Sequence, residues 1–238
     1  MLIFAHIFAG AASGLVLWWF LRDTRIIPLC IAASILSDVI DKPLGFIFLP
    51  QTLGPGRIYF HALLAVVVIT ALAFLVWRSR NSTIVFLVAG AVLLHQLFDA
   101  MWHEPVFWFY PVLGPFQPYH DTNYFGTYFW LEISSVSEWV FLFATLLVVS
   151  LVYVNRFTLP FPSWISRLRV PACFAVLLFL AVLGSYSVWS GSTGTGNLMA
   201  PYNTTPEDNL IMGVVALAGF CILVASRHVA ALSGGLKK

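Results

Sequence analysis

Residues 93–102 read LLHQLFDAMW and close a long apolar segment that runs from Thr83 to Trp102. On a helix, His95 and Asp99 lie on one face, one turn apart. A neutral ring nitrogen and an anionic oxygen so placed can bind one cation. The alternative is a core histidine followed by an aspartate at the helix end. Within a bilayer a central charge costs about 2.5–3.5 kcal/mol on insertion scales, and this cost favours a functional role.

The composition of the chain is that of a polytopic membrane protein. Of its 238 residues, 60% are hydrophobic and 9% are charged, with a mean hydropathy of +0.90. A soluble domain of this length does not need so much apolar surface. The formal net charge of +2 gives no indication of a nucleic-acid partner. We therefore expect an integral membrane protein of the all-α class, a helical bundle that forms one transmembrane domain over residues 1–238.

About seven apolar segments approach the length of about 20 residues that a membrane-spanning helix needs. They are Ile3–Leu21, Ile26–Ile40, Arg57–Trp77, Thr83–Trp102, Tyr128–Val154, Val170–Trp189 and Asn209–Ala225. The first four form a predicted core over residues 1–102. Residues 103–127 are rich in proline and aromatic residues, which predicts an interfacial lid rather than a continuous helix. Residues 128–238 supply three further helices and a tail.

The distribution of basic residues predicts the orientation of this bundle. With seven crossings, ten of the 12 Lys and Arg residues fall on the side that holds the carboxyl terminus. The other two, Lys42 and Arg57, fall on the side that holds the amino terminus. The positive-inside rule therefore places the amino terminus outside and the carboxyl terminus in the cytoplasm, in a multi-pass protein of the cell membrane.

Six ionisable side chains then gather at the outer level of the first four helices, where a site would face outside. They are His6, Asp38, Asp41, His61, His95 and Asp99. Intramembrane ionisable groups usually face the bundle interior and pair there. Imidazoles and carboxylates together suit Zn²⁺, with Mn²⁺ or Fe²⁺ as alternatives, and a second ion would account for the surplus of aspartates. The pattern predicts a site for one or two metal ions.

Two further residues are candidates for catalysis. Arg57 precedes His61 by four residues, so on a helix it would point the same way and could hold a phosphate or carboxylate oxygen. The alternative is an arginine that reaches to lipid head groups. Glu138 lies inside the fifth segment and could act as a ligand or as a general acid/base. A buried carboxyl paired with Ser134 or Ser135 is the alternative there.

These motifs resemble the YdjM-like family of membrane-bound, metal-dependent hydrolases over about residues 1–118. The family pattern has an amino-terminal His, a Pro-Asp-x-Asp turn, an Arg-x-x-x-His-Ser helix start, and His-x-x-x-Asp followed by Trp-Pro. This chain has His6, Ser37-Asp38-x-x-Asp41-Lys42-Pro43, Arg57-x-x-x-His61 and His95-x-x-x-Asp99. It departs from the pattern at Ser37, at Ala62 and in one extra residue between the two aspartates. The resemblance thus leaves either Asp38 or Asp41 as the ligand, with Asp41 also a candidate catalytic carboxylate.

A more distant similarity is to the zinc-dependent phospholipases C. It implies that one metal is held by a set of four residues and that His6 with Asp99 holds a second. The set of four would be Asp38 (or Asp41), His61, His95 and Asp99.

The motifs and the membrane level of the site together favour one function. We expect a metal-dependent hydrolase that cleaves a phosphoester or similar bond of a membrane lipid or lipid-linked substrate. A metal or proton transporter is one alternative, but the cytoplasmic halves of the first four segments are nearly purely apolar. A haem-binding membrane protein is another, and the three aspartates among the histidines argue against it.

Cysteine labelling tests the predicted orientation. In a chain whose native Cys30, Cys173 and Cys221 are replaced by alanine, a cysteine at Gln117 should react with an impermeant reagent added from outside. A cysteine at Ser233 should react only after the membrane is permeabilised. The reverse pattern would overturn both the orientation and the outward-facing site.

Overall fold

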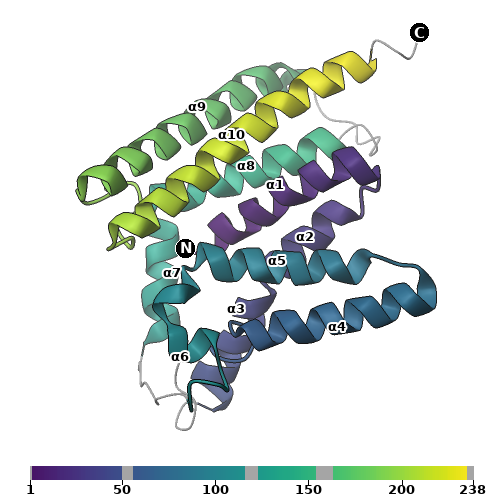
Figure 1. Ribbon diagram of the computed structural model, residues 1–238. Coiled ribbons are helices and arrows are strands. Elements are labelled where there is room, and N and C mark those ends of the chain that lie inside the picture. Colours follow the sequence, from purple (N-terminus) through teal and green to yellow (C-terminus); the bar gives the residue numbers. More distant parts are fainter. Residues whose placement is uncertain (1, 50–55, 116–122, 154–162, 235–238) are drawn as a thin grey trace.

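The computed structural model describes residues 2–49, 56–115, 123–153 and 163–234, and these residues form helices and turns without a strand (Figure 1). The all-α prediction is confirmed. The longer helices are α1 (Ile3–Leu21), α4 (Leu63–Arg80), α5 (Ile84–Phe98), α8 (Val136–Tyr153), α9 (Ser163–Thr193) and α10 (Pro206–Gly234). The shorter ones are α2 (Ile26–Ser34), α3 (Leu36–Pro43), the π-helical η1 (Leu44–Phe48), the 3₁₀ turn η2 (Met101–His103), α6 (Pro105–Trp108) and α7 (Tyr124–Ser134).

Five helices in the described ranges are long and apolar enough to cross a membrane. These spans are Ile3–Leu21, Leu63–Arg80, Val136–Tyr153, Val170–Thr193 and Pro206–Ser226. Helix α5 is also apolar but has only 15 residues. The described residues therefore form a helical membrane bundle. The number of seven crossings and the orientation of the termini stay predictions.

The segment expected as one helix over Ile26–Ile40 is interrupted at Ile35, between α2 and α3. At this break the carbonyl oxygen of Ser34 accepts a hydrogen bond from Nδ1 of His95, at 2.7 Å. Irregular backbone at membrane depth is tolerated where another part of the protein satisfies its polar groups. The interruption therefore places a carbonyl group where His95 needs an acceptor.

Two other predicted helices also differ from the expectation. The segment Arg57–Trp77 becomes helical only at Leu63, so Arg57 and His61 lie in a turn and the inference from helical spacing was wrong. The segment Tyr128–Val154 is divided into α7 and α8 at Ser135. Within the predicted lid, the described residues include η2, α6 and the start of α7, and residues 116–122 lie outside the described ranges.

The apolar core lies among α1, α8, α9 and α10. Helices α9 and α10 run side by side as a hairpin, and α8 and α1 pack beneath them (Figure 1). Phe8 of α1 stacks on Phe141 of α8 with ring centroids 5.4 Å apart. Leu180 and Met212 are fully buried where α9 meets α10. This core holds α1 in place, and α1 carries His6.

Helix α4 forms a hairpin with α5 on the other side of α2, away from α9 and α10 (Figure 1). Apart from Thr70 and the last three residues its residues are apolar, yet Ala73 is the only residue of this helix that is buried. An apolar helix with so much exposed surface is typical of a protein that lipid surrounds. Helix α5 is enclosed more fully and brings His95 towards α1 and α2.

Helices α1 and α2 approach each other closely at two glycines of α1. A Cβ atom on Gly14 would lie 2.9 Å from the Cα atom of Ile27 and 3.2 Å from Cβ of Cys30. A Cβ atom on Gly10 would lie 2.6 Å from the Cys30 carbonyl oxygen. Small residues four apart let two helix backbones pack closely in a membrane, and here they bring α2 against the helix that carries His6.

Replacing Gly14 with leucine should separate α1 from α2, because the backbone of Ile27 cannot move aside. Overpacking of this kind costs about 1–3 kcal/mol, so the purified protein should unfold at a lower temperature in detergent. The matched control is Gly90→Leu in α5, since no atom lies within 4 Å of a Cβ at Gly90. Equal thermal unfolding of the two variants would contradict the proposed close packing.

Candidate metal centre

Four buried side chains from α3, α5 and the turn before α4 meet at one point. They are Asp38, His61, His95 and Asp99, and one ligand atom from each lies within 4.8 Å of the other three. The Nε2 atoms of His61 and His95 are 3.1 Å apart. Three elements that are distant in the sequence thus converge, and each supplies at least one metal-binding atom.

The separations within this group suit a tetrahedral ion. Oδ1 of Asp38 lies 3.5 Å from Nε2 of His61 and 3.8 Å from Nε2 of His95. Oδ2 of Asp99 lies 3.8 Å from each of the two nitrogen atoms. A zinc ion with ligands at about 2.0–2.1 Å would keep neighbouring ligand atoms about 3.3 Å apart. These five separations, which run from 3.1 to 3.8 Å, are therefore close to the value for this donor set.

The protonation of both histidines follows from their outer hydrogen bonds. Nδ1 of His95 lies 2.7 Å from the Ser34 carbonyl oxygen, and Nδ1 of His61 lies 2.8 Å from Oδ2 of Asp41. A carbonyl or carboxylate oxygen only accepts, so both Nδ1 atoms carry the proton. In the neutral rings the two Nε2 atoms then face each other with lone pairs and no proton between them. A cation at this point would remove their repulsion.

The two carboxylate ligands are oriented in the same manner. Oδ2 of Asp38 pairs with Nζ of Lys42 at 2.8 Å, while its buried Oδ1 accepts no hydrogen bond. Oδ1 of Asp99 accepts a hydrogen bond from Nε2 of His6 at 3.0 Å, which leaves Oδ2 facing the histidines. Partners that hold the far side of each ligand are the usual support of a metal site.

Asp41 belongs to this outer layer and fixes the turn that carries His61. Its carboxylate accepts hydrogen bonds from the backbone N–H groups of Ile58, Phe60 and His61, at 2.9–3.1 Å. These N–H groups are thereby held away from helical pairing, which explains why α4 begins only at Leu63. The structure thus places Asp38 among the possible ligands and Asp41 behind His61.

Gln96 holds the same turn from the opposite side. Its Nε2 donates to the carbonyl oxygens of Phe60 and Ala62, at 3.0 and 3.1 Å. Nε1 of Trp108 donates to its Oε1 at 3.0 Å, which ties α6 to the site. Gln96 and Lys42 were not among the predicted site residues. A glutamine beside His95 in an apolar helix and a lysine four residues after Asp38 were the available signals.

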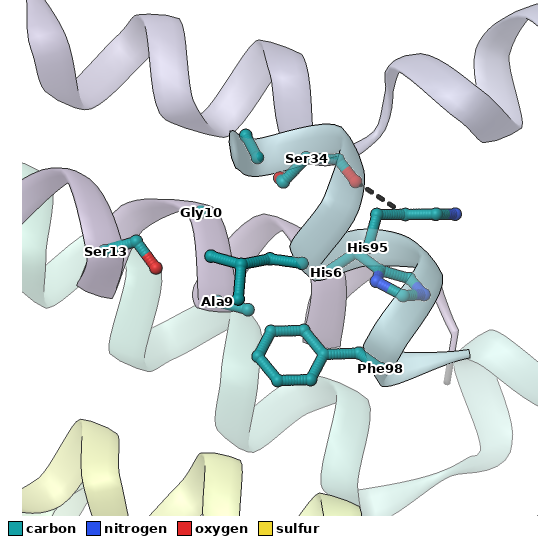
Figure 2. Close-up of a pocket in the computed structure, with 9 residues that line it drawn as sticks. His6, Ala9, Gly10, Ser13, Ser34, His95 and Phe98 are labelled. Atoms are coloured by element: carbon teal, nitrogen blue, oxygen red, sulfur yellow. Dashed lines mark hydrogen bonds between the residues drawn. The ribbon is translucent and has the colours of Figure 1, made fainter. Parts of the chain in front are cut away.

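His6 lies beside the group of four rather than within it. Its ring is 4.0 Å from that of His95, measured between centroids, and its Nδ1 is buried without a hydrogen-bond partner. Figure 2 shows the cavity next to these two rings, with the hydrogen bond from His95 to Ser34 drawn as a dashed line. At about 10 Å³ the cavity has room for about one water molecule and is too small for a substrate.

A much larger cavity of about 670 Å³ opens onto the other side of Asp99, and we call it the entrance chamber. Its lining includes Arg57, Glu104, Tyr202, Glu207 and Asp208. The guanidinium of Arg57 lies 3.5 Å from Oδ2 of Asp99, and its side chain is 40% exposed. Although it is not on a helix, Arg57 therefore lies between Asp99 and the entrance chamber, and its role in substrate binding stays a prediction.

Glu138 is not brought together with the four possible ligands. Its Oε2 accepts a hydrogen bond from the backbone N–H of Ala5 at 3.1 Å, and its Oε1 accepts one from the Tyr202 hydroxyl at 2.6 Å. Glu132 accepts from the N–H groups of Ile3 and Phe4. The two glutamates thus satisfy the first N–H groups of α1, which have no partner within that helix.

One comparison with known proteins identifies a family. The model of the family described as "YdjM inner membrane protein" matches residues 1–192. The chain belongs to this family. The resemblance expected from residues 1–118 is confirmed, and the YdjM match extends it through α9. Searches of the curated proteins and of the solved structures found no match. Helix α10 and the chamber wall that it forms lie beyond the matched residues.

Replacing ligands should separate metal binding from folding. His95→Ala and Asp99→Ala should each remove most of the bound metal, and the double variant should lose little more, because the residues act as one unit. Asp41→Asn should weaken metal affinity by roughly 10–100-fold, since it acts through His61. Metal content per purified molecule, measured by elemental analysis, checks each value.

Expression and gel-filtration behaviour provide the control for these variants. Removing an intramembrane charge should not impair insertion, so the variants should migrate like the wild-type protein. A core-histidine role predicts unstable protein with unchanged metal content per folded molecule. A folded His95→Ala variant with full metal occupancy would rule out this centre.

Proposed function

We propose that this YdjM family member is a membrane-embedded, metal-dependent hydrolase. It would act at the outer membrane interface on a phosphoester or similar bond of a lipid or lipid-linked substrate. The observation that carries the proposal is the pair of buried Nε2 atoms 3.1 Å apart, between two carboxylates; when both rings are neutral, neither Nε2 atom carries a proton. Such an arrangement is unfavourable when buried unless a cation shares it.

Zinc is the ion that we favour for this centre, with Mn²⁺ and Fe²⁺ as alternatives. Two imidazole nitrogens and two carboxylate oxygens at these separations match tetrahedral zinc. A second ion at His6 would have to replace its hydrogen bond to Asp99, so one ion is the simpler occupancy. A bound zinc ion would polarise a substrate oxygen and lower the pKa of a coordinated water to about 7.

Arg57 would position the substrate and stabilise the charge that develops on it. Its guanidinium is anchored at Asp99 and half exposed to the entrance chamber, where it can donate hydrogen bonds to a phosphoryl or carboxylate oxygen. A fixed cation at this position favours a more negative transition state over the ground state. The burial of the ligands excludes bulk water from the inner end, which strengthens these interactions.

The two alternative functions receive less support. A transporter needs polar groups across the bilayer, but α1, α4 and α5 hold no ionisable residue between the level of the metal centre and the last turn at their far ends. A haem would need its axial imidazoles on opposite faces of the ring. The two Nε2 atoms at 3.1 Å leave no room for a porphyrin between them.

Arg57→Ala separates catalysis from metal binding. The variant should keep its metal, because Arg57 is not one of the four ligands, and should lose roughly 10²–10³-fold in kcat. The assay would follow release of product from a panel of phospholipids in mixed micelles, with and without a chelator.

Arg78→Ala, at the far end of α4, removes an equivalent charge and should leave turnover unchanged. Hydrolysis that persists after the chelator has removed all metal would exclude the proposed function. Equal turnover of the Arg57→Ala and Arg78→Ala proteins would exclude the role of Arg57.

A further inference from the structure

The entrance chamber is lined by charged groups of both signs. At its inner end Arg57 adjoins Asp99, one of the four possible metal ligands, and the nearby Oδ1 of Asp38 is buried without a hydrogen bond. The same chamber is also lined by three carboxylates, those of Glu104, Glu207 and Asp208. A simple anion would be attracted by Arg57 and repelled by these three groups.

Two of these three carboxylates, those of Glu207 and Asp208, already have hydrogen-bond partners within the protein. Glu207 accepts a hydrogen bond from Nε1 of Trp102 at 3.0 Å and also pairs with His103. Asp208 accepts from the Thr205 hydroxyl at 2.6 Å, and its own N–H donates to that hydroxyl, which caps α10. These contacts fix both groups to the wall and account for their presence in the absence of a ligand.

Glu104 differs from the other two. It is exposed and follows η2, and its carboxylate makes no hydrogen bond or ion pair with any residue that the structure describes. It does lie close enough to Arg57 for the two charges to interact. A carboxylate that shares a chamber with an anion-binding arginine can receive the cationic part of the same ligand.

We propose that the entrance chamber binds a zwitterionic phosphoryl group, with the phosphoryl oxygens at Arg57 and a tethered ammonium at Glu104. The inference rests on the proposed function and narrows its substrate to phosphoryl compounds that carry an amine. Head groups with an additional carboxylate or phosphate are disfavoured, because their second negative charge would face Glu104 and Glu207. The same chemistry can belong to a lipid head group or to a soluble phosphoamine.

Binding of two matched small molecules tests the proposal in the full-length, zinc-loaded protein in detergent. Phosphoethanolamine and glycerol 3-phosphate are both phosphomonoesters of similar size, and only the first has an ammonium group. Calorimetry should show phosphoethanolamine binding at least about threefold more tightly, which is the range of one partly exposed ion pair. Glu104→Gln should abolish most of the difference, and Glu104→Lys should reverse the order.

Asp23→Asn is the control, since Asp23 is a partly exposed carboxylate beyond the other end of α1 that pairs with Arg25. This variant should keep the wild-type preference. Equal binding of the two compounds, tighter binding of glycerol 3-phosphate, binding of neither, or an unchanged preference in Glu104→Gln would each overturn the proposal.

Nanodiscs distinguish the two sources of the ligand. If the head group belongs to a lipid, discs of phosphatidylethanolamine should compete with bound phosphoethanolamine and discs of phosphatidylglycerol should not. Competition by neither disc assigns the site to a soluble phosphoamine and retains the proposed chemistry. Because no turnover is measured, a protein without hydrolase activity can still show this preference. If the protein hydrolyses its substrate in a metal-dependent manner but does not prefer phosphoethanolamine, the zwitterion-binding proposal is wrong and the proposed hydrolase function stands.

Discussion

Two buried imidazole nitrogens that face each other between two carboxylates are the constraint around which this structure is arranged. The 3.1 Å contact between Nε2 of His61 and Nε2 of His95 exists because each ring donates its Nδ1 proton elsewhere. Asp38 and Asp99 complete the surroundings with oxygen atoms that are also directed by outer partners. These donor atoms are thus all directed at one point, where a cation would make the arrangement favourable.

Interruptions in two helical segments orient these donor atoms. The break at Ile35 releases the Ser34 carbonyl group for His95, and the turn before Leu63 gives its backbone N–H groups to Asp41. A bilayer penalises such irregular backbone unless protein groups satisfy it. Asp41 and Gln96 supply those partners from two sides, so the polar turn can lie inside an apolar bundle. The same hydrogen bonds therefore orient the possible ligands and satisfy the irregular backbone.

The candidate metal centre lies within the residues that match the family, whereas part of the entrance chamber does not. All four possible ligands and Arg57 fall within the residues that match the YdjM inner membrane protein family. The wall formed by Tyr202, Glu207 and Asp208 lies beyond that match. Chemistry shared by a family and recognition particular to one member are commonly divided in this way, because substrate contacts are carried by elements that surround a common site.

The sequence by itself determined the all-α membrane class, the family and the pairing of His95 with Asp99, because hydropathy and helical spacing are local properties. It also named the other possible ligands, Asp38 and His61. It could not choose between Asp38 and Asp41, since the choice depends on which carboxylate the turn before Leu63 surrounds with N–H groups. Nor could it find Gln96, Lys42 or the capping role of Glu138, or see that Arg57 reaches Asp99 from a turn. Most of those assignments depend on contacts between residues far apart in the chain. The others depend on the direction in which a side chain points towards such residues. Only the packing of the helices brings these groups within hydrogen-bonding distance.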